Sequence, residues 1–409
     1  MGSRKTTNQI ERINERTSQQ RCDAPLLVIL PLLTEAKRYM GGCPGEHFCE
    51  PVDYYDQNKK QYVSKTQALL SLLTEGKSIV TTHALFSLFT PEIKAEIKKQ
   101  NYEVIIDEEV TTFKPLKISR QQKRELKKLE YLEIDPITKQ VRWVGPEDDE
   151  EIGTNEYRMF KKEILSGNAF ALDNESIFII QIPADFFKIV DNYVILTYLF
   201  ECSDLCAYFH LNNIKYTINK QNNDEVKKIK KKISSLVEII DSPKAIQKIS
   251  KNRRTHFSNN WWVSRKPSEL KKIRDNVGDY LKRRRCTKEE LLYACPKEIS
   301  TSQEDITKKG RHVQLRGYKD CWIPFNSKAT NEYSNKSVII YMQNVYPNVN
   351  IDKYLKEKGE LKTKEIEDER SLSVMLQCIW RTRIRKGQKI QVMFFSDRMR
   401  EMFERWVNN

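Results

Sequence analysis

The chain has 409 residues, of which 39% are hydrophobic and 31% charged, a composition typical of a globular protein with room for two domains. Lysine and arginine total 71 against 56 acidic residues, and the net charge of +15 favours polyanionic partners, nucleic acid before membrane, although the same charge also serves solubility. The longest apolar stretch, residues 25–33, is too short to span a bilayer, and the start shows no signal-peptide pattern. We therefore expect a cytoplasmic protein without a membrane partner, whose nine cysteines are reduced thiols.

Strands and helices alternate along the first 110 residues. Short apolar runs predict buried strands at 26–31, 77–83 and 102–110. A helix is predicted at 65–73, and a second at 90–100, where Thr90 is a capping residue and Pro91 stands at the first helical position. This alternation is typical of a parallel sheet with crossover helices.

The pattern changes between residues 114 and 185, where a basic helical segment is followed by an acidic loop, and this stretch reads as an insertion. The apolar run 192–200 again has the character of a buried strand. Lysine-rich residues 219–256 predict surface helices. A second α/β pattern closes the chain, with strands at 321–325, 337–347 and 389–395 and helices at 372–385 and 397–407.

Two acids follow the predicted strand at 102–110. At the end of such a strand Asp107 can hold Mg²⁺, often through water, and Glu108 can orient and deprotonate an attacking water. Acidic turns after strands are also common without this chemistry. Near the other end of the chain Gln377, Arg381 and Arg385 are spaced by four, so they would share one face of the helix 372–385. Such arginines can stabilise a transferring γ-phosphoryl group, but a solvated basic helix gives the same pattern.

A series of short segments follows a recognisable order: GSRKTT at 2–7, then LLVILP, IVTTHALF, VIIDEEV, VILTYLF, SKATNEYSNKSVIIY and QCIWRTRIR. This order resembles that of the superfamily 2 helicases, the group that includes the DEAD and DEAH box proteins, mainly over 1–110 and 320–395. The resemblance implies an α/β fold of two RecA-like parallel-sheet domains with a basic insertion. The first domain would span 1–200 with the insertion at about 114–185, a basic connecting region 201–265, and the second domain 266–409.

The resemblance also implies roles for individual residues. ATP would be bound by the opening loop, which comprises Gly2, Ser3, Lys5, Thr6 and Thr7, and Mg²⁺ by Thr6 and Asp107. Hydrolysis would depend on Glu108, Gln377, Arg381 and Arg385. Contacts to nucleic acid would come from Pro31, Thr34, Thr81, Thr82, His83 and Thr197.

Basic segments add further candidate contacts to nucleic acid. Lys230 and Lys231 lie in the lysine-rich stretch, and Arg253 and Arg254 precede the tryptophan pair at 261–262, so phosphate contact combined with base stacking is one interpretation. A set of solvated surface helices is the other. Two groups of cysteine and histidine residues, at 43–49 and 202–210, have spacings that suit either a metal site or buried positions.

The chain departs from the helicase pattern at its start. Arg4 stands where a glycine usually precedes the lysine, and only Met1 precedes Gly2, so there is no room for the strand that feeds a phosphate loop. We therefore expect the sequence to begin inside the loop, at an internal methionine, and to bind ATP weakly or not at all; an expression scar or a coincidence is the alternative explanation of this stretch. Trp380 and the Glu109-Val110 pair also differ from the family and leave the subfamily open.

Two functions are compatible with these features. The first is an ATP-dependent helicase or translocase of phage or mobile-element type, with DNA a better candidate substrate than RNA and with replication or recombination proteins as possible partners. The second is a non-enzymatic nucleic-acid-binding accessory protein with a decayed or truncated ATPase core. ATP hydrolysis with and without nucleic acid discriminates between them.

Overall fold

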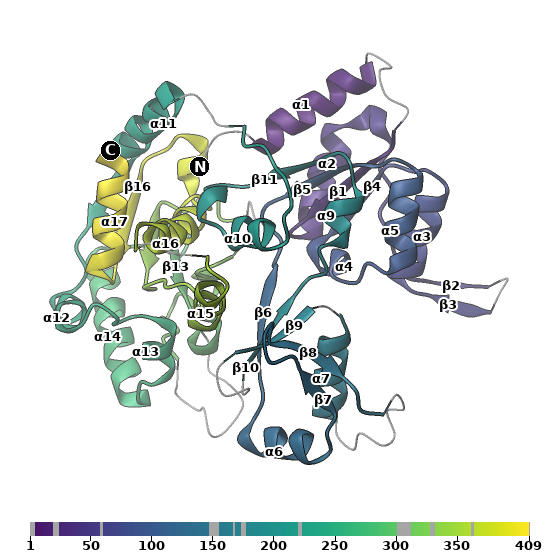
Figure 1. Ribbon diagram of the computed structural model, residues 1–409. Helices are drawn as coiled ribbons and strands as arrows, with labels where there is room; N and C mark the ends of the chain where they lie inside the picture. The colour runs from purple at the N-terminus through teal and green to yellow at the C-terminus, as the bar shows by residue number, and fades with distance from the viewer. Residues whose placement is uncertain are drawn as a thin grey trace. The chain divides into compact units, whose positions relative to one another are not determined.

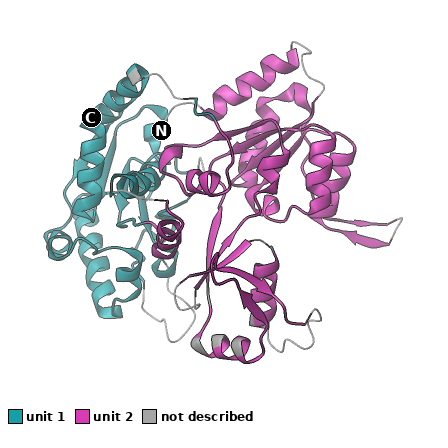
Figure 2. Ribbon diagram, viewed as in Figure 1, with its two compact units in different colours: residues 1–4, 217–346, 364–409 teal, residues 5–216, 347–363 magenta. Residues whose placement is uncertain are grey.

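A computed structural model describes residues 5–18, 24–57, 60–146, 155–166, 168–172, 177–219, 223–300, 312–327, 332–360 and 364–408 (Figure 1). The chain divides into two compact units (Figure 2). Residues 5–216 together with 347–363 form the N-unit, and residues 1–4, 217–346 and 364–409 form the C-unit. Each unit is built around its own parallel sheet.

The N-unit sheet has the strand order β11-β5-β1-β4, and all its pairs are parallel. Its strands are β1 (Leu26–Leu30), β4 (Ile79–Thr82), β5 (Glu103–Asp107) and β11 (Tyr193–Leu196). Every residue of β1 is buried, which explains why this strand is an uninterrupted apolar run. The strands predicted at 26–31, 77–83, 102–110 and 192–200 are therefore confirmed.

Helices connect these strands. They are α1 (Lys5–Ser18), α2 (Ala36–Gly42), α3 (Lys65–Thr74), α4 (His83–Phe86), α5 (Pro91–Lys99), α9 (Asp185–Ile189) and α10 (Asp204–Leu211), with short 3₁₀ turns η1 (Leu33–Glu35), η2 (Pro44–Glu46) and η3 (Phe200–Cys202). The Thr90 hydroxyl accepts a hydrogen bond from the Ile93 amide at 3.4 Å, so the predicted cap of α5 is confirmed. A two-stranded hairpin, β2 (Tyr54–Asp56) and β3 (Gln61–Val63), projects beyond α3 and α5 (Figure 1).

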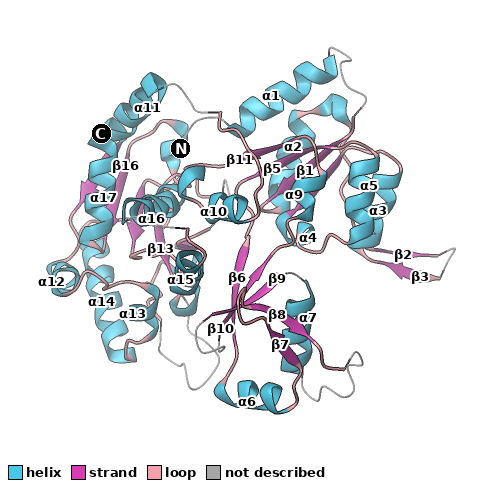
Figure 3. Cartoon of the chain, viewed as in Figure 1, coloured by secondary structure: helices cyan, strands magenta, loops and turns pink. Residues whose placement is uncertain are grey.

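The insertion is an antiparallel sheet of order β6-β10-β9-β8-β7 with two helices (Figure 3). Its elements are β6 (Phe113–Lys117), α6 (Arg120–Lys128), β7 (Leu132–Ile134), β8 (Gln140–Trp143), α7 (Asn155–Ser166), β9 (Asn168–Leu172) and β10 (Ile177–Gln181). The different strand pattern from 114 to 185 follows from this change of sheet type.

A helix from much later in the sequence completes the N-unit. Helix α15 (Val349–Glu357) packs on β6 and β10, and its Tyr354 is only 2% exposed. The Tyr354 ring lies 5.9 Å from that of Phe113 and 5.6 Å from that of Phe170, and the Gln181 amide donates to its hydroxyl. The N-unit core therefore depends on residues that follow most of the C-unit in the sequence.

The C-unit sheet has the order β12-β16-β15-β13-β14, again with parallel pairs. Its strands are β12 (Val237–Ile240), β13 (Leu291–Cys295), β14 (Trp322–Pro324), β15 (Val338–Tyr341) and β16 (Ile390–Phe394). Its helices are α11 (Asn223–Leu236), α12 (Lys244–Asn252), α13 (Asn259–Val263), α14 (Pro267–Arg283), α16 (Lys364–Ile379) and α17 (Asp397–Asn408), with 3₁₀ turns η4 (Lys297–Ile299), η6 (Lys319–Cys321) and η7 (Arg383–Lys386).

The α/β class with two parallel sheets is thus confirmed. The segment 201–265, expected to be a connecting region, contributes α10 to the N-unit and β12 to the C-unit. Over the described residues, no helix has the length and apolar character needed to cross a membrane.

One predicted helix is wrong at its end. The expected helix 372–385 is α16, which ends at Ile379. The last amides tighten to i−3 bonding, since Arg381 donates to the Cys378 carbonyl at 3.0 Å, and Thr382 is extended and buried. Gln377 is therefore helical, whereas Arg381 lies in a turn and Arg385 in η7, and the three do not share one helical face.

Candidate functional site

The candidate site lies where the parallel strands of the N-unit end. Asp107 is the last residue of β5, Thr197 directly follows β11, and His83 directly follows β4. The first turn of α1, from Lys5 onward, reaches the same edge, because Thr6 contacts Asp107. The carboxyl edge of a parallel sheet is the usual place for a ligand in α/β proteins.

Asp107 is the centre of this group. Its Oδ2 accepts hydrogen bonds from the Thr6 hydroxyl at 2.9 Å and from the Tyr39 hydroxyl at 3.3 Å. Asp107 is buried, with 8% of its surface exposed. Burial raises the pKa of the Asp107 carboxyl to about 6, and the nearby Glu108 carboxylate adds to this, while the two hydroxyl donors and Arg38 oppose it. Burial likewise raises the pKa of the Tyr39 hydroxyl, so Tyr39 remains a donor.

Lys5 is the cation of the site. Its ammonium donates to the Thr197 carbonyl and lies 5.4 Å from the centre of the Tyr198 ring. Burial lowers the pKa of Lys5 to about 8, and the carboxylates of Asp107 and Glu108 limit the shift. Next to it, Arg38 donates to the Thr7 hydroxyl at 3.1 Å. The described first turn of α1 contains no acidic residue, so Lys5 favours an anion there, while Arg38 is also paired with Glu35 at 3.6 Å.

Glu108 has a backbone conformation that is unusual for its residue type. Its φ of 63° lies in the left-handed region, and its amide donates to the Leu196 carbonyl at 3.1 Å. Such a conformation costs free energy in a residue with a Cβ, and it occurs frequently at functional sites. The next acid has a different task, because Glu109 Oε1 accepts from the Leu205 amide at 2.9 Å at the start of α10. The two neighbouring acids therefore have separate surroundings.

The residues expected to contact nucleic acid in the N-unit have varied positions. His83 Nε2 lies 3.0 Å from the Asp107 carbonyl oxygen, and the Thr82 hydroxyl accepts from the Leu85 amide at 3.3 Å as the cap of α4. Thr81 is buried in the sheet at 3% exposure. Pro31 is half-buried after β1, and Thr34 is exposed in η1. His83 and Thr82 thus support the edge of the sheet, while Thr34 is open to solvent.

The other candidates lie in the C-unit. Gln377 is half-buried in α16, Arg381 is buried with one Nη atom donating to the Ser327 carbonyl at 3.4 Å, and Arg385 is exposed. Their part in hydrolysis stays a prediction. Gly2, Ser3 and residues 328–331 lie outside the residues that the structure describes.

The basic residues of the C-unit also differ from one another. The Lys230 ammonium lies 5.7 Å from the centre of the Trp406 ring, whereas Lys231, Arg253 and Arg254 are exposed. Trp262 is fully buried in the core, which excludes the stacking role considered for it in this conformation. Among the described residues, no group of three or more His, Cys, Asp or Glu side chains could hold a metal ion, so the cysteine sets at 43–49 and 202–210 form no such cluster.

The oxygen donors at the N-unit edge fit Mg²⁺ better than a softer metal. Thr6 Oγ1 and Asp107 Oδ2 are hard ligands, and their separation of 2.9 Å equals the spacing of adjacent ligands in an octahedral magnesium shell, about 2.9 Å for bonds of about 2.05 Å. Two protein ligands are few, but Mg²⁺ in phosphate-transferring sites is commonly held by one or two protein oxygens together with phosphates and water.

Two residues of this site, Arg38 and Tyr39, were not predicted from the sequence. Both belong to α2, the first α-helix after β1. Their place in this connection was the only feature of the sequence that could have indicated a role at the site. Since the segment after β1 starts at the carboxyl edge, its first helix can place side chains over the end of the neighbouring β5. No residue type at these two positions indicates a ligand by itself.

Comparisons with known proteins define the family. A family model described as the YonV C-terminal Rossmann-like domain matches residues 230–407. The chain is 31% identical over 427 aligned residues to the SPbeta prophage-derived uncharacterized protein YonV of Bacillus subtilis (strain 168), with 100% of this chain and 97% of that protein covered. A solved structure of S. tokodaii Xpd4 is 12% identical at a TM-score of 0.46, covering 97% of this chain and 91% of that chain, and a likeness this low carries no argument. By its similarity to YonV, the chain belongs to the YonV family.

Proposed function

We propose that this protein is a nucleic-acid-dependent ATPase that works as a helicase or translocase. The observation that carries the proposal is the hydrogen bond of 2.9 Å between Thr6 and Asp107, two residues 101 positions apart, beside the buried Lys5. The motif order of superfamily 2 helicases assigns these three residues to phosphate and magnesium binding. A parallel sheet that brings them to its carboxyl edge is the arrangement that this assignment requires.

Each residue then has a defined task. Lys5, which is still mostly protonated at pH 7 with a pKa of about 8, would neutralise the terminal phosphates of ATP. Thr6 and Asp107 would hold Mg²⁺, which supplies charge neutralisation on the phosphates when bound. Glu108 would orient the attacking water and take its proton, from a backbone conformation that separates its side chain from that of Glu109.

Nucleic acid is the proposed partner because of the basic character of the chain. The net charge is +15, and α11 carries five lysines at 227, 228, 230, 231 and 232. Lysines in this density neutralise phosphates without reading sequence, which suits an enzyme that moves along a strand. DNA as the nucleic acid, and a role with replication or recombination proteins, are further parts of the proposal.

ATP hydrolysis by the full chain, with Mg²⁺ and with or without single-stranded DNA, tests the proposal. Glu108→Gln should retain nucleotide binding and lose turnover by on the order of a hundredfold or more. Glu109→Gln is the matched control, because a glutamine can still accept from the Leu205 amide and should leave turnover close to wild type. Excess EDTA should abolish hydrolysis by the wild-type protein and by Glu109→Gln.

A negative result has a specific meaning. If the wild-type chain binds single-stranded DNA but hydrolyses no ATP under any of these conditions, the accessory-protein alternative replaces the enzyme. If Glu108→Gln and Glu109→Gln lose equal activity, Glu108 is not the base.

A further inference from the structure

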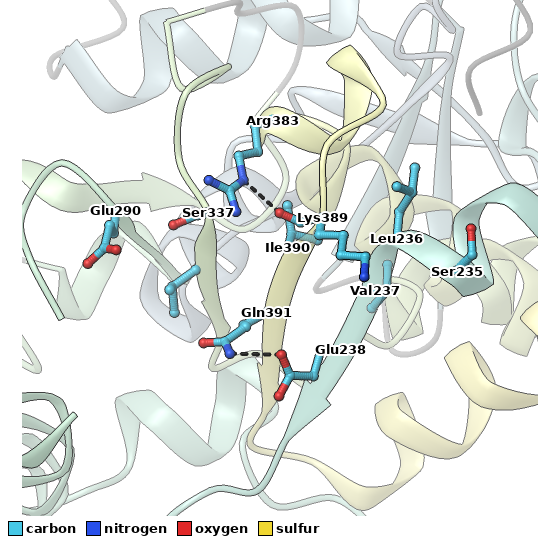
Figure 4. A pocket seen from close by; sticks show the side chains of 11 residues that line it. Ser235, Leu236, Val237, Glu238, Glu290, Ser337, Arg383, Lys389, Ile390 and Gln391 are labelled. Atoms are coloured by element: carbon cyan, nitrogen blue, oxygen red, sulfur yellow. Dashed lines mark hydrogen bonds between the residues drawn. The ribbon is translucent and has the colours of Figure 1, made fainter. Parts of the chain in front are cut away.

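The C-unit contains a cavity of about 530 Å³ at the amino edge of its sheet (Figure 4). It lies where β12, β15 and β16 begin, with Val237, Val338 and Ile390 in its lining. Its volume is in the range of small-molecule sites. The residues of the proposed ATP site, in contrast, belong to the carboxyl edge of the N-unit sheet.

The cations of this cavity have unused donors. Arg383 comes from η7, and its Nε donates to the Lys389 carbonyl at 2.6 Å, which fixes the guanidinium at the cavity wall (Figure 4). In the part of the chain that the structure describes, its two Nη atoms have no hydrogen-bond or ion-pair partner, and the same holds for Lys389 Nζ. The Lys232 ammonium lies against Gly387 in the same loop. Positive charge is therefore available here.

The acids of the cavity are already engaged. Glu238 accepts from Gln391 Nε2 at 2.8 Å (Figure 4), and Gln391 Oε1 accepts from Arg284 at 3.3 Å. Glu290 accepts from the Thr287 amide at 2.9 Å. The carboxylates of Glu238 and Glu290 accept from neutral amides and keep their negative charge, which balances the formal charge of Arg383 and Lys389, while these two cations are left with donors for a ligand. The Ser337 hydroxyl adds a neutral polar group to the lining, whereas the Ser235 hydroxyl already donates to the Lys232 carbonyl at 2.8 Å.

We propose that this cavity binds a phosphate monoester. A guanidinium fixed through Nε presents its two Nη atoms as a fork, which matches two oxygens of a phosphate or carboxylate. Lys389 and the Ser337 hydroxyl add further donors, and a phosphate monoester, with three terminal oxygens, can accept from more of these donors than a carboxylate can. The apolar side chains of Leu236, Val237, Val338 and Ile390 offer a surface for the organic part of the ligand.

A nucleoside monophosphate and the phosphorylated 5′ end of a strand carry the same group, and they can be distinguished by experiment. Binding is measured by calorimetry on the full chain in EDTA, with adenosine 5′-monophosphate against adenosine, and with a 5′-phosphorylated oligonucleotide against its 5′-hydroxyl form. Binding that requires the phosphate supports the proposal in either pair, and the pair that shows it identifies the source.

Variants locate the binding. Arg383→Lys, which keeps the charge and loses the fork, and Lys389→Gln should each weaken the phosphate-dependent binding by about tenfold. Lys386→Gln is the control, because Lys386 is exposed in the same loop but donates to Asn335 and does not line the cavity. Unfolding curves check that all three variants fold.

Three results would overturn the proposal. One is the absence of phosphate-dependent binding to either probe. Another is an equal loss in Lys386→Gln, which would indicate a diffuse charge effect. The third is a loss of binding in Lys5→Met with none in Arg383→Lys or Lys389→Gln, which would place the phosphate at the N-unit edge instead. Because Arg383, Lys389 and the ATP site are tested separately, failure here leaves the proposed ATPase untouched.

Discussion

The two parallel sheets hold buried charge at their carboxyl edges in different ways. In the C-unit, Arg398 follows β16, is 6% exposed, and donates to the Asn344 side chain at 3.1 Å, the Val345 carbonyl at 2.7 Å and the Asp368 carboxylate at 2.6 Å. In the N-unit, Asp107 is held by two neutral hydroxyls, those of Thr6 and Tyr39.

The difference separates structure from function. A buried charge with an opposite charge and several hydrogen bonds stabilises one conformation of the chain. Asp107 is a buried acid whose hydrogen-bond donors are neutral, and its pKa is raised to about 6; the pKa of the nearby Lys5 is lowered to about 8. The negative charge of such an acid is poorly compensated within the protein, so the site suits a ligand that brings positive charge to it. Four measurements can break or sharpen this contrast.

Arg398→Ala should have the largest effect. Its removal leaves the Asp368 carboxylate and the Asn344 oxygen without their donor, and we expect the free energy of unfolding to fall by about 3–5 kcal/mol in urea titrations. Arg400→Ala is the control on the same helix, where half-exposed pairs with Asp241 and Glu404 should cost less than about 1 kcal/mol. Equal losses would show that the Arg398 network is not special.

Lys5→Met should weaken ATP binding without weakening the fold. Loss of the cation should reduce affinity by about 10- to 100-fold, as for a charge-assisted hydrogen bond to phosphate. The free energy of unfolding should be unchanged or higher, because methionine removes a charge that burial disfavours. Lys37→Met, at an exposed position of α2, is the control for both measurements. A marked loss of stability in Lys5→Met would make Lys5 a structural residue.

Asp107→Asn should stabilise the ligand-free protein in a pH-dependent way. The folded-state pKa of about 6 lies above the value of about 3.9 in an unfolded chain, so the ionised form costs the folded state free energy above pH 6. Below about pH 3 both states carry the proton and the cost disappears. In EDTA we expect the variant to gain on the order of 2 kcal/mol at about pH 7.5 and nothing near pH 3. A gain that is independent of pH would contradict this origin.

Charge reversal on α11 should give the smallest effect. Lys231 and Lys232 are exposed, and Lys231→Glu with Lys232→Glu should weaken single-stranded DNA binding by about 3- to 10-fold and reduce the salt dependence of log K by about 1 to 2. Lys98→Glu with Lys99→Glu on α5 makes the same change of charge at exposed positions of the N-unit. If both pairs behave alike, the +15 acts as a diffuse field and not through α11.

Sequence patterns were sufficient for the strands that carry the N-unit site. β1 and the middle of β5, residues 104–106, are buried apolar runs, and Asp107 stands out as the first acid after such a run. Tyr39 was missed because its contact with Asp107 depends on how α2 returns over the edge, which no local pattern encodes. The closeness of Thr6 and Asp107 was implied by the order of the motifs alone.

The C-unit was predicted less well for physical reasons that differ from strand to strand. β12 has four residues and directly follows a lysine-rich helix, so its apolar character is short and adjoins a helical pattern. The end of α16 was misplaced because the arginines after Ile379 continue a helical spacing, whereas the extended, buried Thr382 interrupts the helix. The cavity at the amino edge joins residues from 235 to 391, and only the folded sheet brings them together.

Helix α15 has a consequence for how the protein is made. A ribosome completes residue 216 long before it reaches Tyr354 and Leu355, yet both side chains are buried in the core of the N-unit. During synthesis the surface of β6 and β10 that α15 covers therefore stays exposed until residues 349–357 have emerged from the ribosome. The N-unit thus receives its last core residues, in α15, only shortly before the C-unit receives α16 and α17, although the translation of the N-unit begins first.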